Sequence, residues 1–340
     1  MGTVIAAVVT LLTLFPVRSH ARTLGLVDAP NERSSHRVLT PRGGGVAIIL
    51  GAAAALAFFG SLGELSAAWT LVGAAGLVGA VGLLDDRFGL PPILRLVAQL
   101  CIAAGIVATF GPLDTVPLPP PLNVPLPGPW LAWGLSLLWL SAVTNFFNFM
   151  DGIDGLAAAQ AAAVCAGVVA AGWSSDAVLL ALAVGGASIG FLFHNWPPAH
   201  IFMGDAGSGF LGFALAGMPF LASPARRSDA LLALAVGMTL FLLDPLVTLF
   251  SRARAGKNIF QAHREHLYQQ LVAPEEPAGR VTAGYTGAAL LLALAGAFGY
   301  HNPPAAWMGC AAGVAVFIVV WRHASVRRAH TRASGGISHG

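Results

Sequence analysis

The chain alternates long apolar stretches with short polar segments along its whole length. A helix needs roughly 20 apolar residues to cross a bilayer, and helices satisfy their own backbone hydrogen bonds inside lipid. The pattern therefore predicts an all-α, polytopic membrane helix bundle with about eleven transmembrane helices. The predicted spans are residues 1–17, 44–60, 66–84, 93–110, 130–147, 154–172, 176–193, 208–222, 228–251, 283–300 and 304–321.

Composition supports this class of protein. The 340 residues are 56% hydrophobic and only 10% charged, whereas soluble domains average about 25% charged residues. Ala and Gly are frequent in the apolar stretches, and small residues allow transmembrane helices to pack closely. We predict a single integral membrane domain over residues 1–322. Residues 323–340 are rich in Ser, Gly, His and Arg and are predicted to form a disordered cytoplasmic tail.

Basic residues gather on one side of the predicted membrane. Of the 18 Lys and Arg residues, all but Arg226 and Arg227 fall there. Cytoplasmic loops carry an excess of Lys and Arg. With an odd number of spans, the N-terminus is therefore expected outside and the C-terminus in the cytoplasm. The net charge of +3 follows from this topology and does not indicate nucleic-acid binding.

The segment after the fifth span concentrates amides and carboxylates. It reads Asn145-Phe-Phe-Asn148-Phe-Met-Asp151-Gly-Ile-Asp154, and a carboxylate against a bilayer is costly enough to indicate a functional site. If the helix continues, Asn145 and Asn148 share one face and Asp151 lies one turn beyond. Their oxygens are hard ligands that suit Mg²⁺. The alternative is that these residues only cap the ends of two spans.

Two further acidic motifs fall on the same predicted face. Asp85 and Asp86 end the third span, and adjacent carboxylates repel unless a cation or a proton relieves them. Mg²⁺ with phosphate oxygens would do so; the alternative is a solvated helix end beside Arg87. Asp205 lies in Met-Gly-Asp-Ala-Gly-Ser, just before a helix. That helix start could bind an anion through its backbone N–H groups, or Asp205 or Ser208 could simply cap it.

A histidine motif follows the ninth span. In His263-Arg264-Glu265-His266 the two His side chains would share one face of a helix, but a third zinc ligand with matching spacing is missing. His and Arg suit a diphosphate or a uracil better than a metal. The alternative is a solvated amphipathic helix at the membrane interface.

The first cytoplasmic loop carries Asp28-Ala-Pro-Asn31-Glu-Arg33-Ser-Ser-His36 and ends in Arg42 followed by three Gly residues. Arg33, His36 and Arg42 are candidate phosphate contacts. The Gly run either belongs to this site or only allows tight helix packing.

Taken together and in this order, the motifs resemble the polyprenyl-phosphate N-acetylhexosamine-1-phosphate transferases of glycosyltransferase family 4. This family includes the enzymes that start lipopolysaccharide O-antigen and the phospho-MurNAc-pentapeptide translocase. The resemblance covers about residues 20–275. It implies that undecaprenyl phosphate attacks the sugar-linked phosphorus of a UDP-N-acetylamino sugar in the bacterial inner membrane. UMP leaves, and the polyprenyl-diphospho-sugar starts a lipid-linked glycan.

The resemblance also implies roles for individual residues. Asn148 and Asp205 match the ligands of Mg²⁺, for which Mn²⁺ is an alternative. The matched catalytic carboxylates are Asp85, Asp86, Asp151 and Asp154, and the substrate-binding candidates are Asp28, Asn31, Arg33, His36, Asn145, Arg95, His263, Arg264 and His266. The distribution of Lys and Arg places this site at the cytoplasmic face, and the resemblance is compatible with a homodimer.

Two positions depart from the family pattern. Many relatives carry a basic residue eight positions after the first Asp of the aspartate pair, where this chain has Ile93, so Arg95 is the nearest substitute. Relatives often have a His-rich motif where this chain has Tyr268 and Gln269 after His266. The second departure resembles the O-antigen-initiating branch and favours a plain UDP-sugar. UDP-GlcNAc, UDP-GalNAc and 6-deoxy amino sugars all remain open.

The expected reaction does not need a strong general base to activate the lipid phosphate. A phosphate monoester has a second pKa near 6, so the lipid nucleophile is already largely anionic. The difficulty is to bring it to an anionic diphosphate, which a cation and basic side chains relieve. Direct attack is therefore favoured over a covalent aspartyl intermediate.

Three other classes of protein compete with this interpretation. A transporter or flippase would place polar residues at mid-span, between interrupted helices. An intramembrane prenyl transferase would carry an Asp-rich run of the form D-D-x-x-D, but position 89 is Gly. A non-catalytic scaffold would not explain three acidic motifs on one face.

Overall fold

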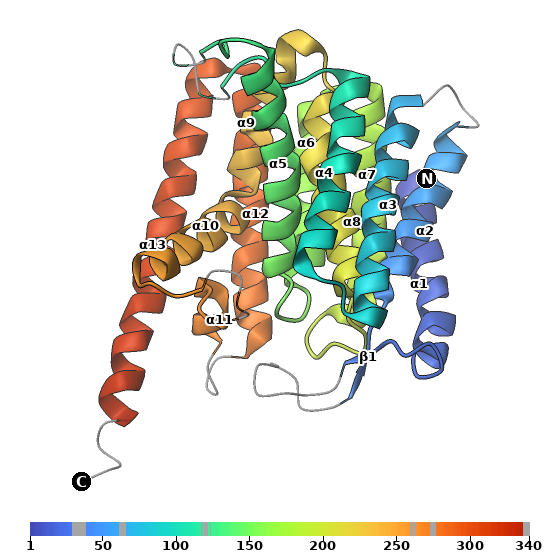
Figure 1. Cartoon of the computed structure of the whole chain (residues 1–340), viewed down its shortest axis with the longest axis vertical. Helices are drawn as coiled ribbons and strands as arrows, with labels where there is room; N and C mark the ends of the chain where they lie inside the picture. The colour runs from blue at the N-terminus through green and yellow to red at the C-terminus, as the bar shows by residue number, and fades with distance from the viewer. Residues whose placement is uncertain are drawn as a thin grey trace.

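The computed structural model describes residues 1–28, 39–60, 66–116, 118, 122, 124–258, 261, 263–272 and 277–335. These residues form an α-helical bundle with one two-stranded sheet (Figure 1). In chain order the elements are α1 (Gly2–His20), β1 (Val27–Asp28), β2 (Thr40–Pro41), α2 (Gly44–Gly60), α3 (Ser66–Phe88), α4 (Pro92–Phe110), α5 (Pro129–Phe149), α6 (Leu156–Ala171), α7 (Ser175–Asn195), α8 (Gly204–Gly217), η1 (Met218–Leu221), η2 (Pro224–Arg226), α9 (Arg227–Gly237), α10 (Thr239–Arg254), α11 (Leu267–Leu271), α12 (Ala278–His301) and α13 (Pro303–Gly335).

The helices that could cross a membrane lie on predicted apolar stretches. Among the described residues, 7 helices are long and apolar enough to cross a membrane, or up to 8 if the bent pair formed by α8–η1 and η2–α9 counts as one span. The apolar helices α2 and α6 are shorter than these. The multi-span helical architecture is therefore confirmed, whereas the count of eleven and the orientation of the termini stay predictions.

The predicted span 228–251 is wrong as a single helix. It consists of α9, which ends at Gly237, and α10, which begins at Thr239 and lies across the bundle (Figure 1). Gly weakens a helix interior, and α10 also carries the buried carboxylate of Asp244. A buried carboxylate needs hydrogen-bond donors, which the tilt of α10 brings within reach. The last helix, α13, continues to Gly335, so residues 323–335 of the predicted tail are helical here.

Helix α8 lies at the centre of the bundle. All of its residues from Ala206 to Gly217 are buried, and it packs against α2, α3 and α5. Its first turn fits between two neighbouring backbones, because both neighbours are Gly there. A Cβ on Gly82 of α3 would lie 2.2 Å from the Asp205 carbonyl oxygen, and one on Gly45 of α2 would lie 2.1 Å from the Gly207 nitrogen. For Gly45, the contacts therefore support the packing role of the predicted Gly run.

Candidate active site

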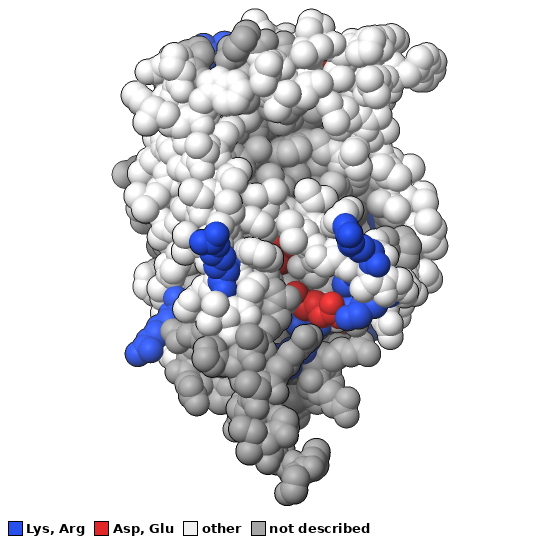
Figure 2. Space-filling model, turned by 90° about the vertical axis from the view of Figure 1, so that its left-hand side faces the viewer, with Lys and Arg blue, Asp and Glu red and all other residues white. Residues whose placement is uncertain are grey.

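The predicted polar motifs lie together at the end of the bundle where α8 begins. This end carries β1 and α11 and lies at the bottom of Figure 1. Figure 2 shows acidic side chains recessed in the lower half of one face, with basic side chains on both sides. Most of the upper half of that face has no charge. The one-sided clustering of polar groups is therefore a property of the fold, whichever compartment it faces.

Asp86 caps the start of α8 from the neighbouring helix. Its Oδ1 accepts a hydrogen bond from the Asp205 N–H at 3.1 Å, and its Oδ2 accepts one from the Ala206 N–H at 3.2 Å. The Asp86 side chain has no exposed surface and also pairs with Arg42 at 3.3 Å. A carboxylate suits the unpaired N–H groups and the positive end of a helix. The anion at this helix start is therefore Asp86 itself, and the cap is supplied by neither Asp205 nor Ser208.

Asp205 lies at the point where four helices meet. Arg95 of α4 donates from Nη1 to Asp205 Oδ2 at 2.9 Å and, from the same nitrogen, to Asp85 Oδ2. Asn148 of α5 lies on the other side, with its Nδ2 at 3.5 Å from the same Asp205 oxygen. Ser208 orients this amide by donating to Asn148 Oδ1 at 2.7 Å. The structure thus brings together Asp85, Arg95, Asn148 and Asp205 from α3, α4, α5 and α8.

A polar cavity of about 20 Å³ adjoins this cluster and is lined by Arg95, Gln99, Asn145, Asn148 and Asp205, among others. This volume suits a single water molecule or ion. Asn145 donates to Gln99 Oε1 at 2.7 Å and to the Ser141 carbonyl at 2.8 Å, so α4 and α5 are tied together here. Among the described residues, no three Asp, Glu, His or Cys side chains form a metal cage.

The other two predicted catalytic acids differ in their surroundings. Asp154 accepts a hydrogen bond from the Ala199 N–H at 2.9 Å, which ties the loop after α5 to the loop after α7. Asp151 is half-buried, and within the described part of the chain no residue bonds to its carboxylate. Burial, and secondly the carboxylates of Asp205 and Asp86, raise the pKa of Asp151 well above its ordinary value. Among the predicted catalytic acids, Asp151 is thus the one whose carboxylate forms no hydrogen bond or ion pair with a described residue.

The histidine motif lies against the loop that follows α5. None of the four residues of this motif is helical, since α11 begins only at Leu267, so the expected shared helix face of the two His is wrong. The rings of His263 and His266 have centroids 4.9 Å apart, and the His266 ring stacks on Phe149 at 6.2 Å. Burial, together with the neighbouring His266 ring, lowers the pKa of His263 to about 4. His263 is therefore neutral at pH 7. The neighbouring Arg264 side chain is exposed.

Tyr268 joins this motif to the Asn148 loop. Its hydroxyl donates to the Phe149 carbonyl oxygen at 3.0 Å, and a Cβ on Gly152 would lie only 2.0 Å from that hydroxyl. Tyr268 therefore occupies space that only a Gly at position 152 leaves open. The sequence pattern treated Tyr268 as a departure and gave no sign of this contact.

The described part of the first loop lies beside the start of α8. Asp28 in β1 pairs with Arg42 at 3.3 Å, and Arg42 in turn pairs with Asp86. The short antiparallel pairing of β1 with β2 places these residues beside α8. Asn31, Arg33 and His36 lie outside the described residues.

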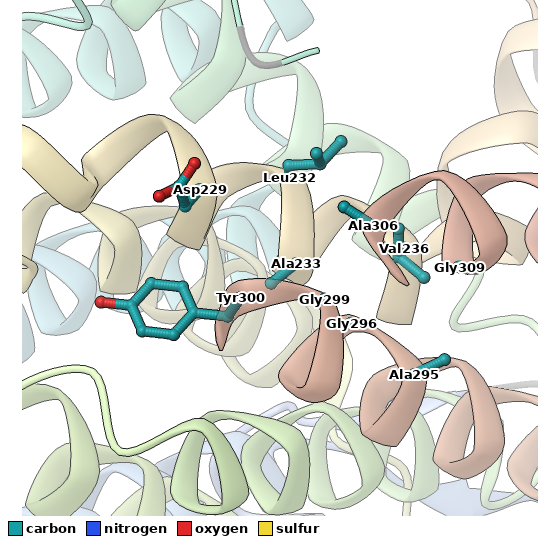
Figure 3. Close-up of a pocket in the computed structure, with 10 residues that line it drawn as sticks. All are labelled: Asp229, Leu232, Ala233, Val236, Ala295, Gly296, Gly299, Tyr300, Ala306 and Gly309. Atoms are coloured by element: carbon teal, nitrogen blue, oxygen red, sulfur yellow. The ribbon is translucent and has the colours of Figure 1, made fainter. Parts of the chain in front are cut away.

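A further cavity lies among α9, α12 and α13, away from these motifs (Figure 3). It is lined by Asp229, Tyr300 and mostly small apolar residues, and its volume is about 20 Å³. It is too small for an organic ligand, and Asp229 is already paired with Arg226 at 3.0 Å.

Comparison with known proteins matches this chain to one family of transferases. The profile of "Glycosyl transferase family 4" matches residues 68–223. A "Probable undecaprenyl-phosphate N-acetylglucosaminyl 1-phosphate transferase" of Bacillus subtilis is 32% identical over 280 residues, which cover 79% of this chain and 77% of the relative. A "Decaprenyl-phosphate N-acetylglucosaminephosphotransferase" of Mycobacterium tuberculosis is 33% identical over 78% of this chain and 74% of the relative.

A shorter match reaches a second kind of transferase. A "Phospho-N-acetylmuramoyl-pentapeptide-transferase" of Synechococcus is 40% identical over 150 residues, which cover 42% of this chain and 44% of the relative. All three relatives are named as transferases, and none of the matches favours a transporter.

Proposed function

The chain belongs to glycosyl transferase family 4, and from this premise we propose that it transfers a sugar 1-phosphate from a UDP-N-acetylamino sugar to undecaprenyl phosphate. The products are UMP and an undecaprenyl-diphospho-sugar that starts a lipid-linked glycan such as O-antigen. The observation that carries the proposal is the meeting of Asp85, Arg95, Asn148 and Asp205 beside one small polar cavity. We place this end of the bundle at the cytoplasmic face, where UDP-sugars are made.

The main barrier is electrostatic, because an anionic phosphate must approach an anionic diphosphate. Arg95 lies within the cluster, and Arg42 lies next to it, paired with Asp86. At an effective dielectric constant of about 20, two unit charges 4 Å apart interact by about 4 kcal/mol. Positive charge fixed at this point therefore favours both the approach and the transition state. Because the lipid phosphate is largely ionised at pH 7, Asp151 is needed at most to accept a residual proton.

The residues present fit a magnesium ion whose coordination shell is completed by substrate oxygens. Mg²⁺ in such sites is held by one or two carboxylates, waters and substrate phosphates rather than by a protein cage. Asp205 would hold it through its carboxylate, and Asn148 through its amide oxygen, which accepts from Ser208 in this structure and would turn toward the cavity of about 20 Å³. When bound, the ion would supply positive charge to the phosphate oxygens. Asp86 is less suited to this role because the start of α8 already occupies both of its oxygens.

The test is UMP release by purified protein given undecaprenyl phosphate and a panel of UDP-sugars. UMP release should require the lipid phosphate, the UDP-sugar and Mg²⁺, with Mn²⁺ as the second ion to try. Undecaprenol, which lacks the phosphate, is the matched control and should give no UMP. Full activity in EDTA would contradict the role given to the ion, and failure with every UDP-sugar would contradict the reaction.

A labelled-exchange experiment separates direct attack from a covalent intermediate. A phospho-aspartyl enzyme would form without lipid and would move label from UMP back into the UDP-sugar. Direct attack predicts no such exchange until undecaprenyl phosphate or the lipid product is added. Exchange in the absence of any lipid would overturn direct attack while leaving the overall reaction intact.

Replacing Gly152 with Ala should lower UMP release by about tenfold or more, because overpacking of this size costs about 1–3 kcal/mol. The new Cβ would lie 2.0 Å from the Tyr268 hydroxyl and would push the histidine motif away from the Asn148 loop. Adding Tyr268→Phe, which removes the hydroxyl, should restore part of the loss. The matched control is Gly284→Ala, where no atom lies within 4 Å of the new Cβ. Equal activity of Gly152→Ala and Gly284→Ala would contradict this packing argument.

A further inference from the structure

Asp244 is a buried carboxylate that none of the sequence motifs identified. It lies in α10 with no solvent exposure and is surrounded by donors. Its Oδ1 accepts from the Leu267 N–H at 2.9 Å and from the Thr248 hydroxyl at 3.1 Å, and its Oδ2 accepts from the Tyr268 N–H at 3.2 Å. A buried carboxylate needs such partners, so α10 and the start of α11 are fixed to each other at Asp244.

The remaining partner of Asp244 is a ring nitrogen of His266. The His266 Nδ1 lies 3.2 Å from Asp244 Oδ1. The ring is buried and stacks with those of Phe149 and Tyr268, with centroid distances of 6.2 and 5.9 Å. A carboxylate beside Nδ1 keeps the proton on that nitrogen. Among the described residues nothing bonds to Nε2, so Nε2 is the atom through which His266 can contact a ligand.

Fixing the tautomer matters for what Nε2 can do. With the proton held at Nδ1, a neutral His266 presents an acceptor at Nε2, and a doubly protonated one presents a donor. Without a carboxylate partner, a neutral His266 could instead carry its proton on Nε2. In that tautomer Nε2 could only donate a hydrogen bond. The analogous exchange of Asp for Asn beside a His in a serine protease leaves the geometry intact but selects the wrong tautomer.

We propose that Asp244 is a positioning residue that holds His266 in the Nδ1–H tautomer, with Nε2 directed at the UDP-sugar donor. This inference rests on the proposed function for the identity of the ligand, a nucleoside diphosphate. The tautomer itself does not depend on it. Asp244 touches neither substrate and acts only through His266.

The alternative is that Asp244 merely anchors the start of α11 through the two backbone N–H groups. A double-mutant cycle separates these roles. Asp244→Asn alone should raise the KM for the UDP-sugar, or lower kcat, by about 10- to 100-fold, the size of loss found when a group that orients a metal-bound histidine is removed. In a His266→Ala background the same substitution should cost less than about twofold, because no ring remains to be oriented. Equal losses in both backgrounds would show that Asp244 only anchors the backbone.

Thr248→Val is the matched control. It removes another hydrogen bond to the same carboxylate oxygen but leaves the ring nitrogen untouched. We expect the KM values of both substrates to stay within about twofold of those of the unsubstituted protein. A loss as large as that of Asp244→Asn would mean that any disturbance of this carboxylate has the same effect, and would overturn the specific role of His266.

The tautomer can also be measured without substituting Asp244. In protein labelled with ¹⁵N-histidine, the ring signals of His266 are assigned by their loss in His266→Gln. We expect a protonated Nδ1 and an unprotonated Nε2 at high pH. A protonated Nε2 would overturn the inference even if Asp244→Asn fails to fold. The nitrogen signals do not depend on turnover, so absence of UMP release would count against the proposed function alone.

Discussion

Replacing Asp205 with Asn should lower the turnover number for UMP release by about a thousandfold, the upper end of the range for losing one charge-stabilising group at a reacting centre. The carboxylate is the shared partner of Arg95 and Asn148. An amide of the same size keeps the shape but loses the negative charge that would hold Mg²⁺ and orient Arg95. The fold should survive, because the cap of α8 is made by the Asp205 backbone N–H with Asp86 and not by the substituted side chain.

The measurement is steady-state UMP release together with thermal unfolding of the same preparation. Asp229→Asn is the matched control, since Asp229 is paired with Arg226 at a surface position outside this cluster. We expect that control to keep activity within about twofold, as surface substitutions usually do. Activity of Asp205→Asn within tenfold of the unsubstituted protein would remove Asp205 from the reaction.

Replacing Arg95 with Met should lower kcat/KM for undecaprenyl phosphate by about a hundredfold, and more than Arg95→Lys does. Arg95 is the only described cation that bridges Asp85 and Asp205. Without it, Asp85 and Asp205 lose the cation that pairs with both of them, and neighbouring like charges repel. Met keeps the apolar length of the side chain but loses the charge, whereas Lys keeps a charged nitrogen like the single Nη1 with which Arg95 contacts both carboxylates.

Arg87→Met is the control for loss of one positive charge near the same face. Arg87 is exposed at the end of α3 and lies 5.2 Å from the Phe88 ring centroid. A drop caused only by a weaker general field would affect both variants and would disappear at high salt. Equal effects of Arg87→Met and Arg95→Met would therefore contradict the bridging role. A change confined to the KM for the UDP-sugar would mean that Arg95 serves the donor and not the lipid.

Much of the site could be predicted from the sequence because the residues carry their own chemistry. Asn148 and Asp205 were predicted to meet, and their side chains lie 3.5 Å apart. Arg95 was expected as a substitute for a base at position 93, and it contacts both Asp85 and Asp205. Their roles in binding and catalysis stay predictions until the experiments above are done.

Other parts of the site could not be predicted, because they depend on contacts between distant segments. Asp85 and Asp86 look equivalent in the sequence. In the structure, however, both oxygens of Asp86 accept hydrogen bonds from the start of α8, about 120 residues further along the chain. Asp244 looked like one acid within an apolar run. Its partners at positions 266–268 are supplied by a loop whose path no local pattern indicates.

The sequence by itself determined that this chain forms membrane helices with its polar chemistry at one end. In lipid every backbone group must be satisfied locally, so apolar length and the placement of charges are enough to specify helices and their polar ends. The tertiary structure decided which carboxylates remain available and where a predicted span breaks. Those outcomes depend on close approaches such as Gly82 against Asp205 and Gly152 against Tyr268. The sequence shows where a Cβ is missing, but only the tertiary structure shows which neighbour occupies that space.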